Sequence, residues 1–110
     1  MVVVVVADKE RELAELYAAS LVRRGHDARA WSDEGTSAGN TEVLVIDTLL
    51  SAGDEIVRRF RAVSPKLALI ATGIHSRPVK QPSLLGALYL KKPFALADLE
   101  AAVAREAASI

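Results

Sequence analysis

Five short apolar segments punctuate the chain, and each has the length of a β-strand. The clearest is residues 43–46, a wholly apolar run of Val-Leu-Val-Ile, which is typical of a strand buried on both faces of a parallel sheet. Residues 2–6 are all valine, and β-branched side chains favour extended backbone. The pattern predicts strands at residues 2–6, 27–31, 43–46, 67–71 and 88–90, of which 27–31 is the weakest and is expected at a sheet edge.

Three longer segments carry apolar residues at helical spacing. They predict helices at residues 9–24, 54–63 and 96–107. Gly25 is suited to end the first helix, and Asp54 is suited to cap the start of the second. The residues expected to face the sheet are Leu13, Leu16, Tyr17 and Leu21 in the first helix, Ile56, Val57, Phe60 and Val63 in the second, and Leu96, Leu99 and Val103 in the third, with Ser20 and Ala107 at the margins.

Two connections lack the pattern of a full helix. Residues 32–41 are rich in glycine and capping residues and leave room for one helical turn at most. Residues 74–83 contain Pro78 and Pro82, which disfavour a regular helix, and residues 83–87 can supply one turn. The alternation of strands and helices predicts an α/β fold: a flavodoxin-like, doubly wound sheet of five parallel strands in the order 2-1-3-4-5.

Composition narrows the class of protein. At 110 residues, the chain (1–110) is expected to form a single domain. Its 14 basic residues balance its 14 acidic ones, so no electric field favours nucleic acid or an anionic membrane. Cysteine is absent, which excludes disulfides, thiol catalysis and thiolate metal sites. No apolar stretch approaches the roughly 20 residues that span a bilayer. We therefore expect a cytoplasmic protein.

Four polar side chains closely follow predicted strands: Asp8, Asp47, Thr72 and Lys92. The carboxyl ends of parallel strands share one sheet edge, and the order 2-1-3-4-5 places Asp8 opposite Asp47. Two close carboxylates need a cation, and an oxygen site with few protein ligands suits Mg²⁺. Lys92 and the Thr72 hydroxyl could then orient a tetrahedral anion on Asp47. This set of groups is suited to forming an aspartyl phosphate.

With these residues in this order, the chain resembles the receiver domain of bacterial two-component response regulators over essentially its whole length. The matching features are an acidic residue after the first strand, Asp47 after the third, Thr72-Gly73 after the fourth, and Tyr89 followed by Lys92-Pro93-Phe94. Each feature alone is weak, but the ordered set at near-family spacing is specific.

The resemblance implies a role for each residue of the set. Asp47 is the expected phosphoacceptor, and Mg²⁺ is expected on Asp8, Asp47 and the backbone carbonyl of Leu49. The phosphoryl group is expected to contact Thr72, Lys92 and the Gly73 amide. By the same resemblance, Tyr89 is expected to be an aromatic switch that turns inward when Thr72 moves. The Lys92-Pro93 peptide bond is expected to be cis, which would aim the lysine inward.

The chain also departs from the family pattern. Receivers usually carry two acidic residues after the first strand, and here the first of them is Ala7. Ser51 stands in place of a usual proline, and Glu55 stands where glycine is common. Compared with the family, the second and fourth helices are expected to be shorter. In the family, the fourth helix forms part of the surface that passes the signal to other proteins.

Position alone allows simpler interpretations of the same residues. Asp8 could cap the first helix, a role compatible with metal binding. Thr72 could bond only to backbone in a turn. Tyr89 could be a half-buried strand residue, and Trp31 is expected to pack at the sheet edge.

The leading hypothesis is a stand-alone receiver that takes a phosphoryl group from a histidine kinase or histidine phosphotransfer protein onto Asp47. It would signal to a downstream protein target by a change in conformation, with a homodimer also allowed. It is expected to be a signalling domain rather than an enzyme, apart from catalysing its own phosphorylation and dephosphorylation. The alternative is a pseudo-receiver that serves as an unphosphorylated interaction or dimerisation module. A flavin-binding or phosphatase-like enzyme has little support.

Overall fold

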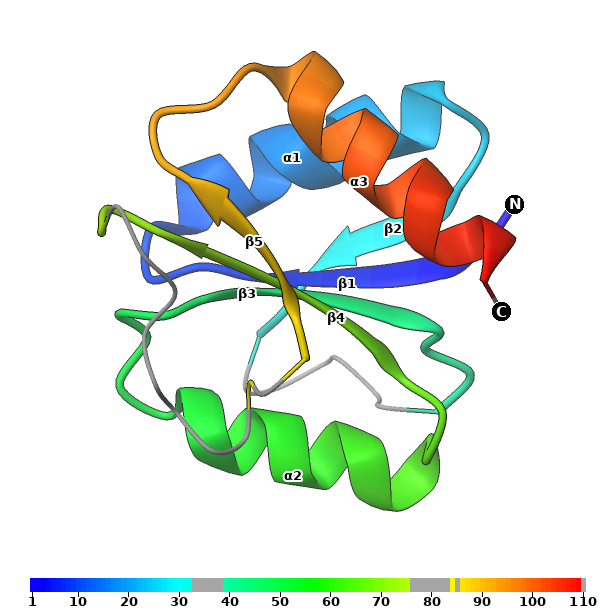
Figure 1. The fold of residues 1–110 in the computed structure, drawn as a ribbon, viewed down its shortest axis with the longest axis vertical. Coiled ribbons are helices and arrows are strands. Elements are labelled where there is room, and N and C mark those ends of the chain that lie inside the picture. Colours follow the sequence, from blue (N-terminus) through cyan, green and yellow to red (C-terminus); the bar gives the residue numbers. More distant parts are fainter. Residues whose placement is uncertain (33–38, 76–83, 85, 110) are drawn as a thin grey trace.

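The computed structural model describes residues 1–32, 39–75, 84 and 86–109. These residues form a parallel five-stranded sheet in the order β2-β1-β3-β4-β5, as predicted (Figure 1). The strands are β1 (Val3–Ala7), β2 (Asp27–Ala30), β3 (Val43–Asp47), β4 (Ala68–Gly73) and β5 (Leu88–Lys91). The helices are α1 (Arg11–Arg23), α2 (Gly53–Val63) and α3 (Leu96–Ala108). Each strand lies within two residues of its predicted bounds.

The sheet separates two hydrophobic cores. Helices α1 and α3 cover one face and α2 covers the other (Figure 1). Because side chains alternate along a strand, Val4 and Val6 of β1 enter the core under α1 and α3, while Val5 enters the core under α2. All five residues of β3 are buried, which confirms the strand predicted to be covered on both faces.

The sequence predicted the end of α1 correctly and the cap at the start of α2 incorrectly. Gly25 has φ of 91°, and its amide donates to the Val22 carbonyl, so it ends α1 in the left-handed conformation that glycine tolerates. The capping role predicted for Asp54 is wrong, because α2 begins at Gly53 and its cap residue is Ala52. Asp54 lies instead in the first turn, where its charge favours the helix dipole.

Two residues predicted to face the sheet are exposed. Leu16 is 47% exposed, because α1 packs through Tyr17, Leu21 and the small residue Ala14. Leu16 lies about 100° around the helix from Tyr17, outside that face. Val63 is 57% exposed as the last residue of α2, so the buried face of that helix ends one turn earlier, at Phe60.

A partly buried polar contact links α1 to α3. The hydroxyl of Ser20, which is fully buried, donates a short hydrogen bond to the carboxylate of Glu100. Arg24 Nε donates to the same carboxylate over 2.9 Å. The hydrogen bonds from Ser20 and then Arg24 lower the pKa of Glu100. The Ser20–Glu100–Arg24 contact therefore fixes α1 against α3.

The two predicted helix-poor connections are described only in part. Ala87 donates its amide to the Leu84 carbonyl over 3.1 Å, which forms a turn within the predicted range 83–87. Residues 33–38 and 76–83 lie outside the described residues, and with them Pro78, Pro82 and most of the two connections for which shortened helices were predicted. In the portion of the chain that the structure describes, no helix has the length and apolar character needed to cross a membrane.

Candidate functional site

The parallel register brings the predicted polar residues to one edge of the sheet. Asp47 pairs with Thr72 between β3 and β4, and Ala7 pairs with Ile46 between β1 and β3. Asp8 therefore follows β1 beside the end of β3. Lys92 follows β5 after Lys91. We call the residues Asp8, Asp47, Thr72 and Lys92 the Asp47 site.

Lys92 bridges the two carboxylates of the site. Its Nζ lies 2.7 Å from Asp8 Oδ2 and 3.5 Å from Asp47 Oδ2. The Asp8 and Asp47 side chains are only 2% and 1% exposed, so both charges lie out of bulk water. Burial lowers the pKa of Lys92, but the hydrogen bond to Asp8 and the charges of both carboxylates outweigh burial and leave that pKa raised. The lysine is therefore charged at neutral pH. The peptide bond between Lys92 and Pro93 is cis, as expected.

The two oxygens of the Asp47 carboxylate differ. Oδ1 accepts a hydrogen bond from the Leu49 amide over 3.0 Å, which fixes the orientation of the side chain. Oδ2 is buried and accepts no hydrogen bond, and its near neighbour is the Lys92 ammonium. A buried anionic oxygen without a donor is costly unless a cation or a reacting group uses it. Oδ2 is thus the oxygen of this carboxylate that remains available to a cation or a reacting group.

Asp8 lies just before α1 but is not its cap residue, which is Glu10, and the metal-binding role of Asp8 stays a prediction. Its Oδ1 accepts the Glu10 amide over 2.9 Å, just before the start of α1, while Oδ2 faces Lys92. The bond to Glu10 fixes the carboxylate in place, because it anchors the side chain to the backbone entering the helix. The Asp8 carboxylate is thus held by the Glu10 amide through Oδ1 and by the Lys92 ammonium through Oδ2.

Backbone hydrogen bonds tie the loops of the site to β4. The Thr48 amide donates to the Thr72 carbonyl over 2.8 Å, and the Lys92 amide donates to the Gly73 carbonyl over 2.6 Å. The loop after β3 and the loop after β5 are therefore held on either side of β4. Thr72 itself is 1% exposed, so its side chain is buried at this edge of the sheet.

Tyr89 of β5 reaches over the end of β4. Its hydroxyl donates to the His75 carbonyl over 2.7 Å. A methyl group added at Gly73 would lie 2.8 Å from that hydroxyl and 2.6 Å from Thr48 Oγ1. Gly73 therefore lets the tyrosine and the loop after β3 pack onto the backbone of β4.

Replacing Gly73 with alanine is expected to destabilise the protein by about 2 kcal/mol, because the new methyl group would displace Tyr89 or Thr48 from a packed position. Urea denaturation would measure the change. Gly53→Ala is the matched control: a methyl group there meets only Ile46 Cδ1 at 3.6 Å, at the start of α2. Alanine favours helix, so this variant should be neutral or more stable by about 0.5 kcal/mol. Equal losses in the two variants would contradict the packing at Gly73.

One neighbour of the site was not identified from the sequence. Tyr17 was predicted only as a core residue of α1, and its ring does pack on Phe94, with ring centroids 5.3 Å apart. Burial raises the pKa of Tyr17, and the charges of Lys92, Asp8 and Asp47 also act on it. Tyr17 therefore lies within electrostatic reach of the Asp47 site. The helical spacing could not show which end of the sheet this side chain approaches.

The donor set of the site fits a hard divalent cation with few protein ligands. Asp8 and Asp47 both direct an oxygen at one ammonium, and Asp47 Oδ2 lacks a hydrogen-bond donor. Among the described residues, no group of three or more His, Cys, Asp or Glu residues gathers as a metal cluster. Mg²⁺ accepts such a sparse site because it retains several waters. Leu49 contributes its amide to Asp47, and the metal-binding role of its carbonyl stays a prediction.

Comparison with known proteins rests on structure alone. No protein-family model matches the sequence, and no curated protein matches it. A response regulator receiver domain from Clostridium thermocellum is similar to this chain with a TM-score of 0.76 and 19% identity, over 99% of this chain and 96% of that one. The response regulator TrrA of Thermotoga maritima, in complex with Mg²⁺ and BeF, gives a TM-score of 0.75 and 20% identity, over 96% and 99% of the two chains.

A longer protein also contains this fold. NtrX from Brucella abortus, in complex with ADP, gives a TM-score of 0.76 and 20% identity over 99% of this chain, which spans 27% of NtrX. The chain therefore has the fold of response regulator receiver domains, as its sequence resemblance predicted.

Proposed function

We propose that residues 1–110 act as a receiver domain in a phosphorelay, in which Asp47 accepts a phosphoryl group. The donor would be a histidine kinase or a histidine phosphotransfer protein, and the altered surface would signal to a downstream protein. The main support is the Asp47 carboxylate: it is 1% exposed, faces Lys92, and has one oxygen that accepts no hydrogen bond. This role would place the protein in the cytoplasm.

The proposed transfer is a displacement at phosphorus. Asp47 Oδ2 attacks the phosphorus of a phosphohistidine, and a P–O bond forms as the P–N bond breaks. The imidazole leaves with the electron pair of the broken bond and takes up a proton. Lys92 stays charged, because its pKa is raised, and with the Thr72 hydroxyl it would counter the charge of the transferred group. The Gly73 amide would assist.

Mg²⁺ fits this proposal. Asp8, Asp47 and the Leu49 carbonyl would hold it, and the ion would neutralise negative charge on the phosphoryl oxygens. Lys92 now pairs more closely with Asp8 than with Asp47, so cation binding would compete with an existing ion pair. Ala7 adds no third carboxylate to this set. We therefore expect weak Mg²⁺ affinity.

The signal would arise from Thr72 and Tyr89. Thr72 is buried beside Asp47 in the paired register of β3 and β4, so a phosphoryl group on Asp47 could draw its hydroxyl toward the new charge. Tyr89 packs over the neighbouring Gly73, so it would respond to a movement there. The product is a changed surface, which makes the protein a signalling domain that at most catalyses its own phosphorylation and dephosphorylation.

Incubation with acetyl phosphate and Mg²⁺ is expected to add a single phosphoryl group, and removal of the metal with a chelator is expected to prevent the addition. The reason is that two buried carboxylates repel an anionic donor unless a cation neutralises them. Intact mass spectrometry measures the adduct. An adduct that forms equally with chelator would contradict the metal's role. Its absence under all donors, with the fold intact, would contradict phosphoryl transfer.

The alternative is a pseudo-receiver that binds a partner or a second copy of itself without phosphorylation. Ala7 and the short Lys92–Asp8 ion pair favour this alternative, since both weaken the case for bound Mg²⁺. An Ala7→Asp variant separates the two. If the wild type forms no adduct but the variant does, the missing carboxylate is the cause, and the natural protein is a pseudo-receiver.

A further inference from the structure

Tyr17 of α1 contacts the segment that carries Lys92. Its ring packs on the ring of Phe94, two residues after Lys92, with the centroids 5.3 Å apart and the ring planes inclined at 33°. Tyr17 is 7% exposed and belongs to the hydrophobic core under α1 and α3. A tilted aromatic pair at this separation stabilises a contact beyond the apolar area that it buries. The pair therefore joins α1 to the segment between β5 and α3.

The same helix is tied to Asp8, the closer partner of Lys92. Asp8 Oδ1 accepts the amide of Glu10, the cap residue of α1. Asp8 Oδ2 lies 2.7 Å from Lys92 Nζ. Both partners of this ion pair are thus connected to α1, Asp8 at the start of the helix and Lys92 by way of Phe94 and Tyr17. A change in how α1 packs on Phe94 would alter the separation between the ammonium and Asp8.

The surroundings of Tyr17 also favour the ion pair. Burial raises the pKa of Tyr17, so its phenol is neutral at neutral pH and adds no charge to the site. The charges of Lys92, Asp8 and Asp47 also act on this hydroxyl, which places it close to the pair. The side chains of Lys92 and Asp8 are 16% and 2% exposed. An ion pair is stronger where water is excluded, and the ring of Tyr17 contributes apolar bulk beside it.

The backbone of Lys92 is held independently of Tyr17. Its amide donates to the Gly73 carbonyl of β4 over 2.6 Å. Loss of the Tyr17 ring is therefore expected to leave the end of β5 on β4. The effect of that loss should appear at the Lys92 ammonium.

We propose that Tyr17 is a positioning residue of the Asp47 site, which acts through Phe94 to keep the Lys92 ammonium on Asp8. Lys92 Nζ lies farther from Asp47 Oδ2, at 3.5 Å. While Lys92 is held in this way, Mg²⁺ has to displace it from Asp8. Tyr17 thereby limits the affinity of the site for the metal. This consequence for Mg²⁺ rests on the proposed function, and the positioning of Lys92 does not.

The ¹⁵N NMR signal of the Lys92 ammonium tests the positioning directly, because its hydrogens exchange fastest with water when the ion pair opens. The signal is assigned by its absence in Lys92→Met. Tyr17→Leu, which removes the ring, is expected to speed the exchange about 5-fold, as expected for the loss of one aromatic contact. Tyr17→Phe keeps the ring and should retain the wild-type rate. An unchanged rate in Tyr17→Leu, or an equal increase in Tyr17→Phe, would overturn the proposal.

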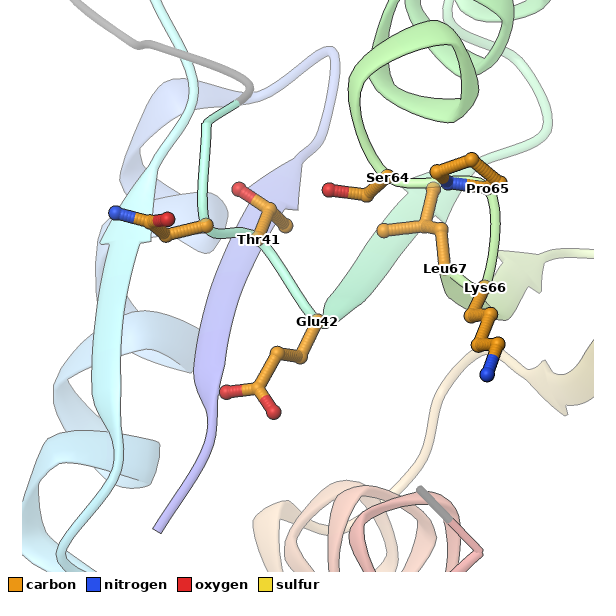
Figure 2. A pocket seen from close by; sticks show the side chains of 7 residues that line it. Thr41, Glu42, Ser64, Pro65, Lys66 and Leu67 are labelled. Carbon is orange, nitrogen blue, oxygen red and sulfur yellow. The ribbon is translucent and has the colours of Figure 1, made fainter.

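Leu67→Ala is the control for a general loss of core packing. Leu67 is 7% exposed, as Tyr17 is, but it precedes β4 at the opposite end of the sheet from Asp47. There it lines a pocket of about 370 Å³ together with Thr41 and Pro65 (Figure 2). This variant should lose stability and leave the exchange at Lys92 unchanged. Equal acceleration in Leu67→Ala and Tyr17→Leu would show that the whole fold has loosened, which would overturn a specific role for Tyr17.

Phe94→Leu removes the other ring of the pair from a half-buried position. It is expected to accelerate exchange at Lys92 to the same extent as Tyr17→Leu, and the double variant should add nothing further, because both changes remove one contact. Should Tyr17→Leu fail to fold, Phe94→Leu decides in its place. An unchanged rate in Phe94→Leu would contradict the path from Tyr17 to Lys92.

A Mg²⁺ titration followed through the Leu49 amide tests the consequence for the metal. Tyr17→Leu is expected to bind Mg²⁺ about 5-fold more tightly than the wild type, because the competing ion pair on Asp8 is weaker. Equal affinities, despite faster exchange at Lys92, would overturn the link between Tyr17 and the metal. If neither protein binds Mg²⁺, the proposed metal site fails, while the exchange at Lys92 still decides whether Tyr17 positions the lysine.

Discussion

An Asp47→Asn variant is expected to take up no phosphoryl group from acetyl phosphate, at any time or Mg²⁺ concentration. An amide oxygen is a poor nucleophile, and asparagine lacks the negative charge that the proposed Mg²⁺ site requires. The fold should persist, because the asparagine oxygen can still accept the Leu49 amide and the loss of one of two close carboxylates relieves their repulsion. Intact mass spectrometry over a time course, with circular dichroism for the fold, measures both outcomes.

Asp54→Asn is the matched control for this variant. Asp54 is an exposed carboxylate in the first turn of α2, away from the strand ends, and its replacement should leave the adduct unchanged. If Asp47→Asn still gains a phosphoryl group, the phosphoacceptor is a different residue, and peptide mapping of the adduct would locate it. If both variants lose the adduct, the loss reports damage to the fold.

A Lys92→Met variant is expected to be less stable than the wild type by about 3 kcal/mol at neutral pH. The substitution leaves Asp8 and Asp47 buried without their shared cation, and an uncompensated buried charge is among the most costly defects in a protein. Urea denaturation measures the difference. Lys91→Met is the control, since Lys91 is the exposed neighbour on β5 and its removal should cost less than about 0.5 kcal/mol.

The stability difference between wild type and Lys92→Met should depend on pH in one direction. The pKa of Lys92 is raised in the folded protein, so its contribution is fully present below its unfolded pKa of about 10.4. That contribution is lost as the pH rises through the folded pKa. The difference between the two proteins should therefore hold at neutral pH and narrow under alkaline conditions. A difference that grows with pH would show that Lys92 is not the paired cation.

The sequence predicted the sheet well because its strands are strongly marked. Five consecutive valines and the run at residues 43–46 have little alternative to a buried strand, and the parallel order follows from their alternation with helices. The same pattern could not predict how closely each helix packs on the sheet, or which of its apolar side chains become buried. Leu16 has an apolar side chain and lies near the buried face, but Ala14 lets α1 approach the sheet on the other side of Tyr17.

The sequence predicted which polar residues share this edge of the sheet but not how their side chains pair, and their roles stay predictions. That Asp8, Asp47, Thr72 and Lys92 share one edge follows from strand order. That Lys92 lies closer to Asp8 than to Asp47 depends on side-chain positions, which no spacing along the chain determines. The hydroxyl of Thr41, which is buried without a hydrogen-bond partner, is a second feature that the sequence could not predict. The residue is an ordinary member of a loop in the sequence, and only tertiary packing removes its hydrogen-bond partners.

The path of α3 determines where the two ends of the chain emerge. That helix starts at Leu96, shortly after Lys92 in the chain, and runs back along the sheet, so Val2 and Ala107 belong to the same hydrophobic core. Figure 1 shows both ends on the side where β1 begins. A fluorescent protein or a surface tether could therefore be fused at either end without blocking a phosphodonor from Asp47. Single-molecule measurements of phosphotransfer could use the same two attachment points.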